Sequence, residues 1–273
     1  MQQLISELSR LYLLEPQLCF EDADRQLPLP LTPGRLEQHL LGLKTVSLAL
    51  LSAEGRGRTI VLDFSAGGPS RGEQQWRALC TLANAVRDRL NLPAPAVSIS
   101  GHGFQLWLSL AAPAPAADIA EFARLLHAAH LVDDKDRDNG VLAPLVELPP
   151  GRQPGGKWAA FIHPGMGASF ADEPALEMAP PIGAQVGFLE GLRSIGAAEF
   201  AAALAQLRRL QAPLPAAAPA IAPAADPARH SGAGVPAGLL LQDATLEDIV
   251  AWLHARNIEP TFRHLIRAVG PAL

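Results

Sequence analysis

The chain has 273 residues, of which 49% are hydrophobic and 18% charged, and its formal net charge is −5. Such a chain can bury a full core in one domain or two subdomains, which excludes a disordered or fibrous protein. Its two cysteines, Cys19 and Cys80, exclude a disulfide framework. No apolar run reaches about 18 residues and the N-terminus lacks the pattern of a secretion signal, so we expect a cytoplasmic protein that makes no contact with membranes.

Hydrophobic periodicity and turn residues predict an alternation of helices and strands along the chain. The expected elements, in order, are a helix at 3–14, a helix at 33–43, strands at 46–51 and 58–64, a helix at 72–90, strands at 96–99 and 104–110, a helix at 116–129, strands at 146–148 and 158–163, and a helical stretch at 186–210 broken near Gly196. Short loops join them. The pattern predicts an α/β (α+β) fold in which helices flank a mixed sheet.

The composition changes near the end of the chain. Residues 211–238 are rich in alanine and proline, which favours an extended linker. Residues 239–273 predict a short C-terminal helical hairpin with an apolar stripe formed by Leu246, Ile249, Leu253, Phe262 and Leu265. About 35 residues are too few for an independent core, so we expect this segment to dock on a protein partner or on the chain's own domain of residues 1–210.

A turn of sequence Ser100-Gly101-His102-Gly103 precedes a strand in which apolar and polar residues alternate. Gln105, Trp107 and Ser109 share one face of that strand, since successive strand side chains point to opposite sides. The two glycines would allow backbone N–H groups to approach an anion closely. The sequence therefore predicts a phosphate-binding turn beside a polar strand face.

This stretch resembles the second motif of the archaeo-eukaryotic primase superfamily, Ser-x-Ser-Gly-x-Gly-x-His-x-Trp, in the form found in the primase-like domains of TOTE conflict systems. Ser98, Ser100, Gly101, Gly103 and Trp107 match that motif in register. The resemblance continues through residues 29–32 and 39–42, the strand at 59–65, the segments 145–149 and 155–164, and residues 185–195. It covers roughly residues 25–200 and implies a primase-polymerase-like fold.

The chain departs from this family at the catalytic positions. The resemblance implies a two-metal site built from an Asp-x-Asp pair and a third Asp, with a His that contacts the incoming nucleotide. Here Asp63 is retained, whereas Ser65, Gln105 and His163 stand at the other three positions. One carboxylate with a hydroxyl and an imidazole is a poor ligand set for Mg²⁺ or Mn²⁺. We therefore expect degenerate catalytic motifs, a weak metal position at Asp63, and no cofactor.

If the strands pair as in that family, Asp63, Ser65, Gln105 and His163 converge on one open face of the sheet. The alternative is that they are scattered polar residues at strand ends. Only Cys19 remains of the cysteine cluster that such relatives carry upstream, so zinc is not expected. Mg or Mn would be the cofactor only if the site were active.

Three functions are compatible with these observations. The first is an inactive primase-like subunit that binds single-stranded nucleic acid or a nucleotide and assists a partner enzyme in a defence or mobile-element system, with reverse-transcriptase-linked and CRISPR-associated settings included. The second is an active primase-polymerase with an altered metal site, and the third is a protein-interaction module that keeps only the fold. The net charge of −5 argues against a broadly basic surface. The binding residues expected for the first function are Ser100, Gly101, His102, Gly103, Arg152 and Lys157.

Overall fold

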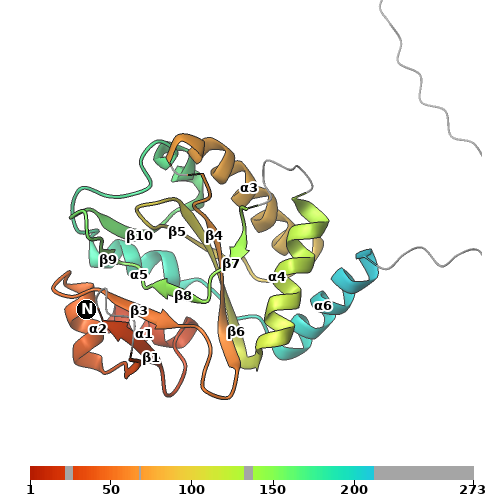
Figure 1. Ribbon diagram of the computed structural model, residues 1–273, viewed down its shortest axis with the longest axis horizontal. Coiled ribbons are helices and arrows are strands. Elements are labelled where there is room, and N and C mark those ends of the chain that lie inside the picture. Colours follow the sequence, from red (N-terminus) through yellow and green to blue (C-terminus); the bar gives the residue numbers. More distant parts are fainter. Residues whose placement is uncertain (22–26, 68, 132–137, 212–273) are drawn as a thin grey trace, which may run out of the picture. The chain divides into compact units, whose positions relative to one another are not determined.

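A computed structural model describes residues 1–21, 27–67, 69–131 and 138–211 (Figure 1). Most of the linker and the whole C-terminal segment, with Leu246, Ile249, Leu253, Phe262 and Leu265, lie outside these ranges. Within the described ranges, no helix is long and apolar enough to cross a membrane. The description that follows concerns the unit within residues 1–216.

A six-stranded sheet forms the centre of this unit. Its strand order is β7-β4-β6-β5-β10-β9. The bounds are Val141–Leu142 for β7, Arg56–Phe64 for β4, Phe104–Pro115 for β6, Ala96–Ile99 for β5, Trp158–Ile162 for β10 and Gly151–Arg152 for β9. The pairings between these strands are antiparallel.

A second, four-stranded sheet has the order β2-β1-β3-β8 and is also antiparallel. Its strands are β2 (Leu29–Pro30), β1 (Leu18–Glu21), β3 (Val46–Ala49) and β8 (Leu145–Glu147). The fold is therefore α+β, as the sequence predicts. The expectation of a mixed sheet is corrected, because parallel pairing among the described residues is confined to one isolated bridge between Leu110 and Ile195.

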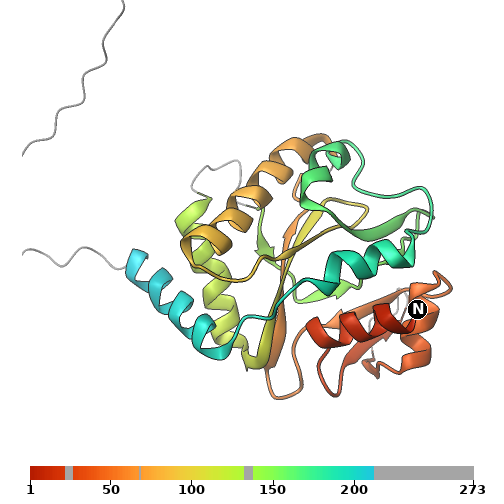
Figure 2. The same cartoon turned by 180° about the vertical axis from the view of Figure 1, so that it is seen from behind.

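Helices cover both faces of the central sheet. They are α1 (Gln2–Leu11), α2 (Pro33–Leu40), α3 (Gly72–Asn84), α4 (Ala116–His130), α5 (Ile182–Glu190) and α6 (Ala197–Gln211), with short 3₁₀ segments at Pro69–Arg71 and Pro164–Phe170. Apolar residues of α3, α4 and α6 join one core, and those of α1, α2 and α5 join the other. Seen from behind, α1 and α5 lie side by side in front of the sheet (Figure 2).

Strand alternation divides β4 between the two cores. Ile60, Leu62 and Phe64 pack towards α3 and α4, whereas Val61 packs towards α1. On the α1 side, Trp107 and Phe161 meet Tyr12, whose ring centroid lies 5.2 Å from that of Trp107 and 5.9 Å from that of Phe161. This aromatic contact fixes the end of α1 against the sheet.

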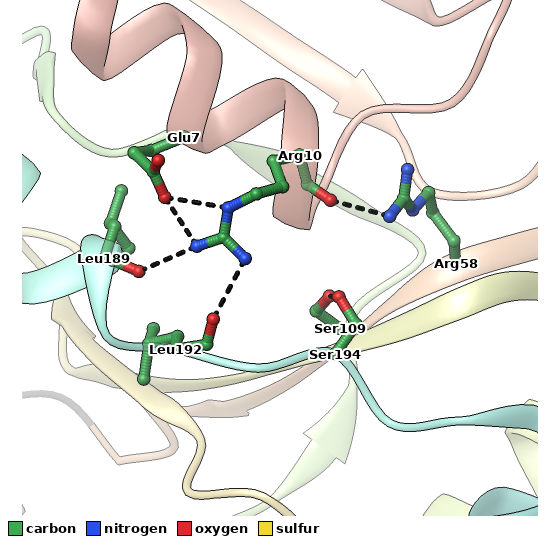
Figure 3. Close-up of polar contacts among 7 residues, drawn as sticks. All are labelled: Glu7, Arg10, Arg58, Ser109, Leu189, Leu192 and Ser194. Atoms are coloured by element: carbon green, nitrogen blue, oxygen red, sulfur yellow. Dashed lines mark hydrogen bonds and ion pairs between the residues drawn. The ribbon is translucent and has the colours of Figure 1, made fainter.

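Polar contacts tie α1 to α5 (Figure 3). The Arg10 guanidinium donates to the carbonyl oxygens of Leu189, at 3.1 Å, and Leu192, at 3.0 Å, near the end of α5. Glu7 accepts from the same guanidinium. Arg58 of β4 then donates to the Arg10 carbonyl at 2.7 Å. The Leu189 carbonyl also accepts from the Leu192 N–H at 3.0 Å, so these bonds add to the backbone bonding at the ends of the two helices.

Buried His39 joins α2 to β3 and to the residue that follows β8 in the smaller sheet. The Val46 N–H donates to His39 Nδ1 at 3.0 Å, so the proton is on Nε2, which donates to the Leu148 carbonyl at 2.6 Å. Helix α2 begins as expected, with the Arg35 N–H donating to Thr32 Oγ1 at 3.3 Å and Pro33 in the first turn.

The Gln185 side chain of α5 makes the hydrogen bonds to β10 that a neighbouring strand would otherwise make. Its amide oxygen accepts from the Phe161 N–H at 2.9 Å, and its amide nitrogen donates to the Phe161 carbonyl at 3.0 Å. Gln185 is 2% exposed, so both bonds are made inside the protein. They complete the backbone hydrogen bonding of β10 beyond the two residues that pair with β9.

Several boundaries differ from the sequence prediction. The helix expected at 72–90 ends as a π-helical turn over Ala85–Arg89. The break expected near Gly196 is confirmed, although the first of the two helices begins earlier than expected, at Ile182. Strands β1, β2, β7 and β9 were not expected. Three of them have two residues each and so carry no periodic pattern.

Candidate functional site

Asp63 and Gln105 face each other on neighbouring central strands. The register pairs Asp63 of β4 with Gln105 of β6, Gln105 with Ser98 of β5, and Ser98 with Phe161 of β10. The four residues therefore form one row across the sheet. Side chains of residues that pair directly lie close enough to interact, so this row brings a carboxylate, an amide and a hydroxyl together.

A chain of hydrogen bonds runs along this row from the core to the carboxylate. Trp107 Nε1 donates to Ser98 Oγ at 2.8 Å, and Ser98 Oγ donates to Gln105 Oε1 at 3.2 Å. Gln105 Nε2 then faces Asp63 and donates to its Oδ2 at 3.4 Å. Because the indole N–H can only donate, the direction of each bond is determined.

Ser65 engages the second oxygen of the same carboxylate. Its backbone N–H donates to Asp63 Oδ1 at 3.0 Å, and its hydroxyl donates to that atom as well. Both oxygens of Asp63 are thus acceptors for neutral groups of the chain. We call Asp63, Ser65, Ser98, Gln105 and Trp107 the Asp63 network.

The residues present do not fit a two-metal site. Mg²⁺ and Mn²⁺ need several oxygen ligands with negative charge, whereas Asp63 is surrounded by N–H and O–H donors. Within the described ranges, no group of three or more His, Cys, Asp or Glu side chains is placed to hold a metal ion. The Asp63 network instead satisfies the carboxylate by hydrogen bonds alone.

His163 does not join this network. Strand β10 ends at Ile162, which pairs with Val97, so His163 lies one residue beyond the strand and two beyond the row of Phe161. Its side chain is exposed, and its Nδ1 accepts from the Gly165 N–H at 3.0 Å. It begins the 3₁₀ segment at Pro164–Phe170. The expected convergence therefore holds for Asp63, Ser65 and Gln105, and is wrong for His163.

The sheet face that carries the network is only partly open. Val61, Trp107 and Phe161 on this face are buried, with Tyr12 packed on the two aromatic rings. Asp63 and Ser65 are half-buried. The expected open face is therefore limited to the end of β4 near these two residues, because α1 and α5 cover the rest.

The turn at Ser100–Gly103 has a packing role. A side chain on Gly103 would place its Cβ 2.5 Å from the Phe64 carbonyl oxygen and 2.6 Å from Ser65 Cα. Gly101 has a φ of +85°, which favours glycine. Two of the turn's N–H groups are used inside the chain, Ser100 N–H by the Gly103 carbonyl at 3.0 Å and Gly101 N–H by the Pro174 carbonyl at 2.8 Å.

The β9–β10 hairpin carries two of the other expected binding residues, and Arg152 lies on its side towards Gly42, whose ideal Cβ position is 3.1 Å from Arg152 Cβ. The ideal Cβ position of Gly101 is 3.2 Å from Gln153 Cγ, which places the β9–β10 hairpin beside the turn. Arg152 is exposed, and its Nε donates to the Gly156 carbonyl at 3.5 Å. Lys157 forms ion pairs with Glu173 and, at 2.9 Å, with Glu177. His102 is exposed at the tip of the turn.

The arginines that cluster in sequence around β4 bond to separate parts of the chain. Arg56 donates to the Pro113 carbonyl, Arg58 to Arg10, and Arg87 to Asp88. They contact the end of β6, the end of α1 and the π-helical turn. These arginines are close in sequence, but they contact different parts of the structure.

Sequence reasoning missed two features of the site. Ser98 was matched to a motif, yet its place between Trp107 and Gln105 depends on the register of β5 and β6. Gln153 donates to Glu147 at 2.8 Å and so links β8 to the β9–β10 hairpin. No local pattern marks either residue.

Comparison with known proteins gives one structural similarity to report. No protein-family model matches the chain, and no curated protein matches it in sequence. Among solved structures, the chain is similar to the archaeo-eukaryotic primase domain of the cyanophage S-2L primase-polymerase. The two share 15% sequence identity with a TM-score of 0.37, over 69% of this chain and 97% of that one.

Proposed function

We propose that this chain is a primase-like protein that does not catalyse nucleotidyl transfer, binds single-stranded nucleic acid or a nucleotide, and assists a partner enzyme. The observation that carries the first part is the Asp63 network. Ser65 and Gln105 stand where the resemblance implies a second carboxylate and an imidazole, and both donate to Asp63. A carboxylate held in this way is satisfied without an ion.

The binding part of the proposal is supported by Arg152. Its side chain is exposed on the β9–β10 hairpin, lies near Gly156, and among the described residues forms one long bond, to the Gly156 carbonyl. Exposed arginines of this kind bind phosphate oxygens well. Lys157 contributes less, since two carboxylates already neutralise it.

A nucleotide-incorporation assay tests the loss of catalysis. Incubation with labelled nucleotides, a single-stranded template and Mg²⁺ or Mn²⁺ is expected to give no product above that of an Asp63→Ala variant. Template-dependent product that disappears in Asp63→Ala would refute the proposal and favour an active enzyme with an altered metal site.

Introducing the carboxylate and the imidazole that the resemblance implies tests in the opposite direction whether the Asp63 network keeps metal out. A Ser65→Asp, Gln105→His double variant places two more metal- or phosphate-binding groups beside Asp63. We expect calorimetry to detect Mn²⁺ binding to this variant and none to the wild type. Equal Mn²⁺ affinity in both proteins, lost in Asp63→Ala, would show that the Asp63 network does not keep metal out.

Fluorescence anisotropy with labelled single-stranded DNA and RNA, over a salt series, tests binding. We expect Arg152→Ala to weaken affinity and to reduce the slope of log K against log salt by about 0.7 for each lost phosphate contact. Arg209→Ala on α6 is the matched control, and Lys157→Ala should have a smaller effect. Unchanged affinity in Arg152→Ala removes this residue from the site.

A protein-interaction module is the second candidate. The net charge of −5 and the pairing of Lys157 with Glu173 and Glu177 favour it. The absence of DNA, RNA and nucleotide binding in the same assay, together with retained binding to a protein partner, would select this function over the first.

A further inference from the structure

Residues 172–177, which lie between the 3₁₀ segment and α5, contact the turn for which the sequence predicts phosphate binding. The carbonyl of buried Pro174 accepts from the Gly101 N–H at 2.8 Å. Gly101 belongs to the Ser100–Gly103 turn, whose N–H groups are the expected anion donors. One of these donors is therefore bonded to a carbonyl oxygen of the chain itself.

The same segment also neutralises Lys157. Glu173 and Glu177 both form ion pairs with its ammonium group, the second at 2.9 Å. Two carboxylates and one ammonium leave a local net charge of −1. A surface with an excess of negative charge repels phosphate, although it contains a lysine.

Lys157 and the turn border the same surface because of the β9–β10 hairpin. The Gln153 N–H donates to the Lys157 carbonyl at 2.8 Å, so Gln153 lies opposite Lys157 in the hairpin. Side chains of directly opposed residues lie on the same face. Gln153 Cγ is 3.2 Å from the ideal Cβ position of Gly101. The segment 172–177 therefore acts on neighbouring groups.

The segment is held in place without its carboxylates. Leu176 and Trp158 exchange two backbone hydrogen bonds, at 3.0 Å and 2.8 Å, and Pro174 is buried. The side chains of Glu173 and Glu177 are 56% and 73% exposed. Ion pairs at such exposed positions add little to stability, because water and salt screen them. Their main consequence is the charge that they give to this surface.

We propose that residues 172–177 compete with phosphate groups for this surface. Glu173 and Glu177 hold the Lys157 ammonium, and single-stranded nucleic acid binds Lys157 only when its phosphates displace the two carboxylates. This self-inhibition rests on the function proposed above. It also explains why Lys157→Ala alone should have a small effect, since the lysine is already occupied in the wild type.

Tripolyphosphate measures the competition without nucleic acid. The double variant Glu173→Gln, Glu177→Gln removes both charges and keeps the size of the side chains. In NMR titrations of the isotope-labelled full chain, the Lys157 amide of this variant should shift at tripolyphosphate concentrations at least threefold lower than in the wild type. The control, Glu54→Gln with Glu190→Gln, makes the same change in net charge at two other exposed positions. Equal responses of the two double variants would overturn the proposal.

Fluorescence anisotropy with labelled single-stranded DNA then tests the consequence for binding. Glu173→Gln, Glu177→Gln is expected to raise affinity about three- to tenfold at low salt. The slope of log K against log salt should become steeper by about 0.7, the value for one additional phosphate contact on a single strand. Adding Lys157→Ala should remove this gain.

The outcomes separate this inference from the proposed function. If the wild type binds DNA and Glu173→Gln, Glu177→Gln binds no more tightly than the charge control, the inference is wrong and the proposed function stands. If tripolyphosphate binding rises in the variant and neither protein binds DNA or RNA, the proposed function is refuted, while the competition with phosphate at Lys157 is confirmed.

Discussion

Asp63 accepts hydrogen bonds from three groups, and those groups are themselves held in place by the fold. Gln105 cannot turn its amide, because its oxygen accepts from Ser98 and Ser98 accepts from Trp107. A neutral chain of this kind is stable only while every member has its partner. The network therefore connects Asp63 and Ser65, which are half-buried, to Ser98 and Trp107, which are buried in the core.

Ser98→Ala tests this dependence. The change leaves the indole N–H of Trp107 and the side-chain amide oxygen of Gln105 without partners. Each buried polar group without a partner costs about 1–3 kcal/mol. We expect Tm to fall by several degrees in thermal unfolding, since each kcal/mol corresponds to about 2–4 °C for a chain of this size. Ser169→Ala, at an exposed hydroxyl, is the control. An unchanged Tm in Ser98→Ala would mean that the network adds nothing to stability.

His39 predicts a pH dependence of stability. Burial lowers the pKa of His39 below its ordinary value of 6.5, with the carbonyls of Leu148 and Lys44 opposing that effect. The folded state therefore favours neutral His39, while the unfolded chain takes up a proton near pH 6.5. The stabilisation is complete above pH 6.5 and is lost as the pH falls from 6.5 towards the folded pKa.

Denaturant unfolding between pH 5 and 7.5 measures this effect. The free energy of unfolding should fall more steeply below pH 6.5 in the wild type than in His39→Gln, and His102→Gln should follow the wild type because His102 is exposed. If the free energy of unfolding depends on pH in the same way in the wild type and in His39→Gln, His39 is not a buried neutral side chain whose protonation destabilises the fold.

At the scale of elements, the Ser100–Gly103 turn holds two strand ends together. Gly103 allows β6 to begin against the end of β4, so the spacing of glycines in the motif follows from close backbone packing. Gly103→Ala is expected to destabilise the protein by about 1–3 kcal/mol, in the range of overpacked sites. Gly155→Ala has open space around it and should be neutral. Comparable thermal unfolding of the two variants would refute the packing role.

Much of this element plan could be predicted from the sequence. Alternation along β4 and β6 located both strands and the shared face of Asp63 and Ser65, because period-two patterns are strong when one face is buried. The position of His163 could not be predicted, since β10 ends one residue before it and Pro164 begins a 3₁₀ turn. The covering of Trp107 by Tyr12 joins residues 95 positions apart, which no local pattern records.

For the whole molecule, the sequence predicts two roles: residues 1–210 form the domain, and the segment 239–273 docks on a protein partner. We expect truncation after Gly238 to leave the Tm of the domain unchanged while binding to a protein partner is lost, because the apolar stripe of the segment would be buried on the partner. A fall of several degrees in Tm, with partner binding intact, would show that the segment packs on its own domain.

Gln185 bears on how copies of the protein behave at high concentration. A strand with free backbone groups along one side can pair with the same strand of another molecule and start aggregation. The Gln185 amide occupies the Phe161 N–H and carbonyl on the side of β10 that β9 leaves uncovered. A single helical side chain thus satisfies a part of the strand that no neighbouring strand covers. Its replacement by leucine would keep most of the volume but leave the Phe161 N–H and carbonyl without partners inside the protein.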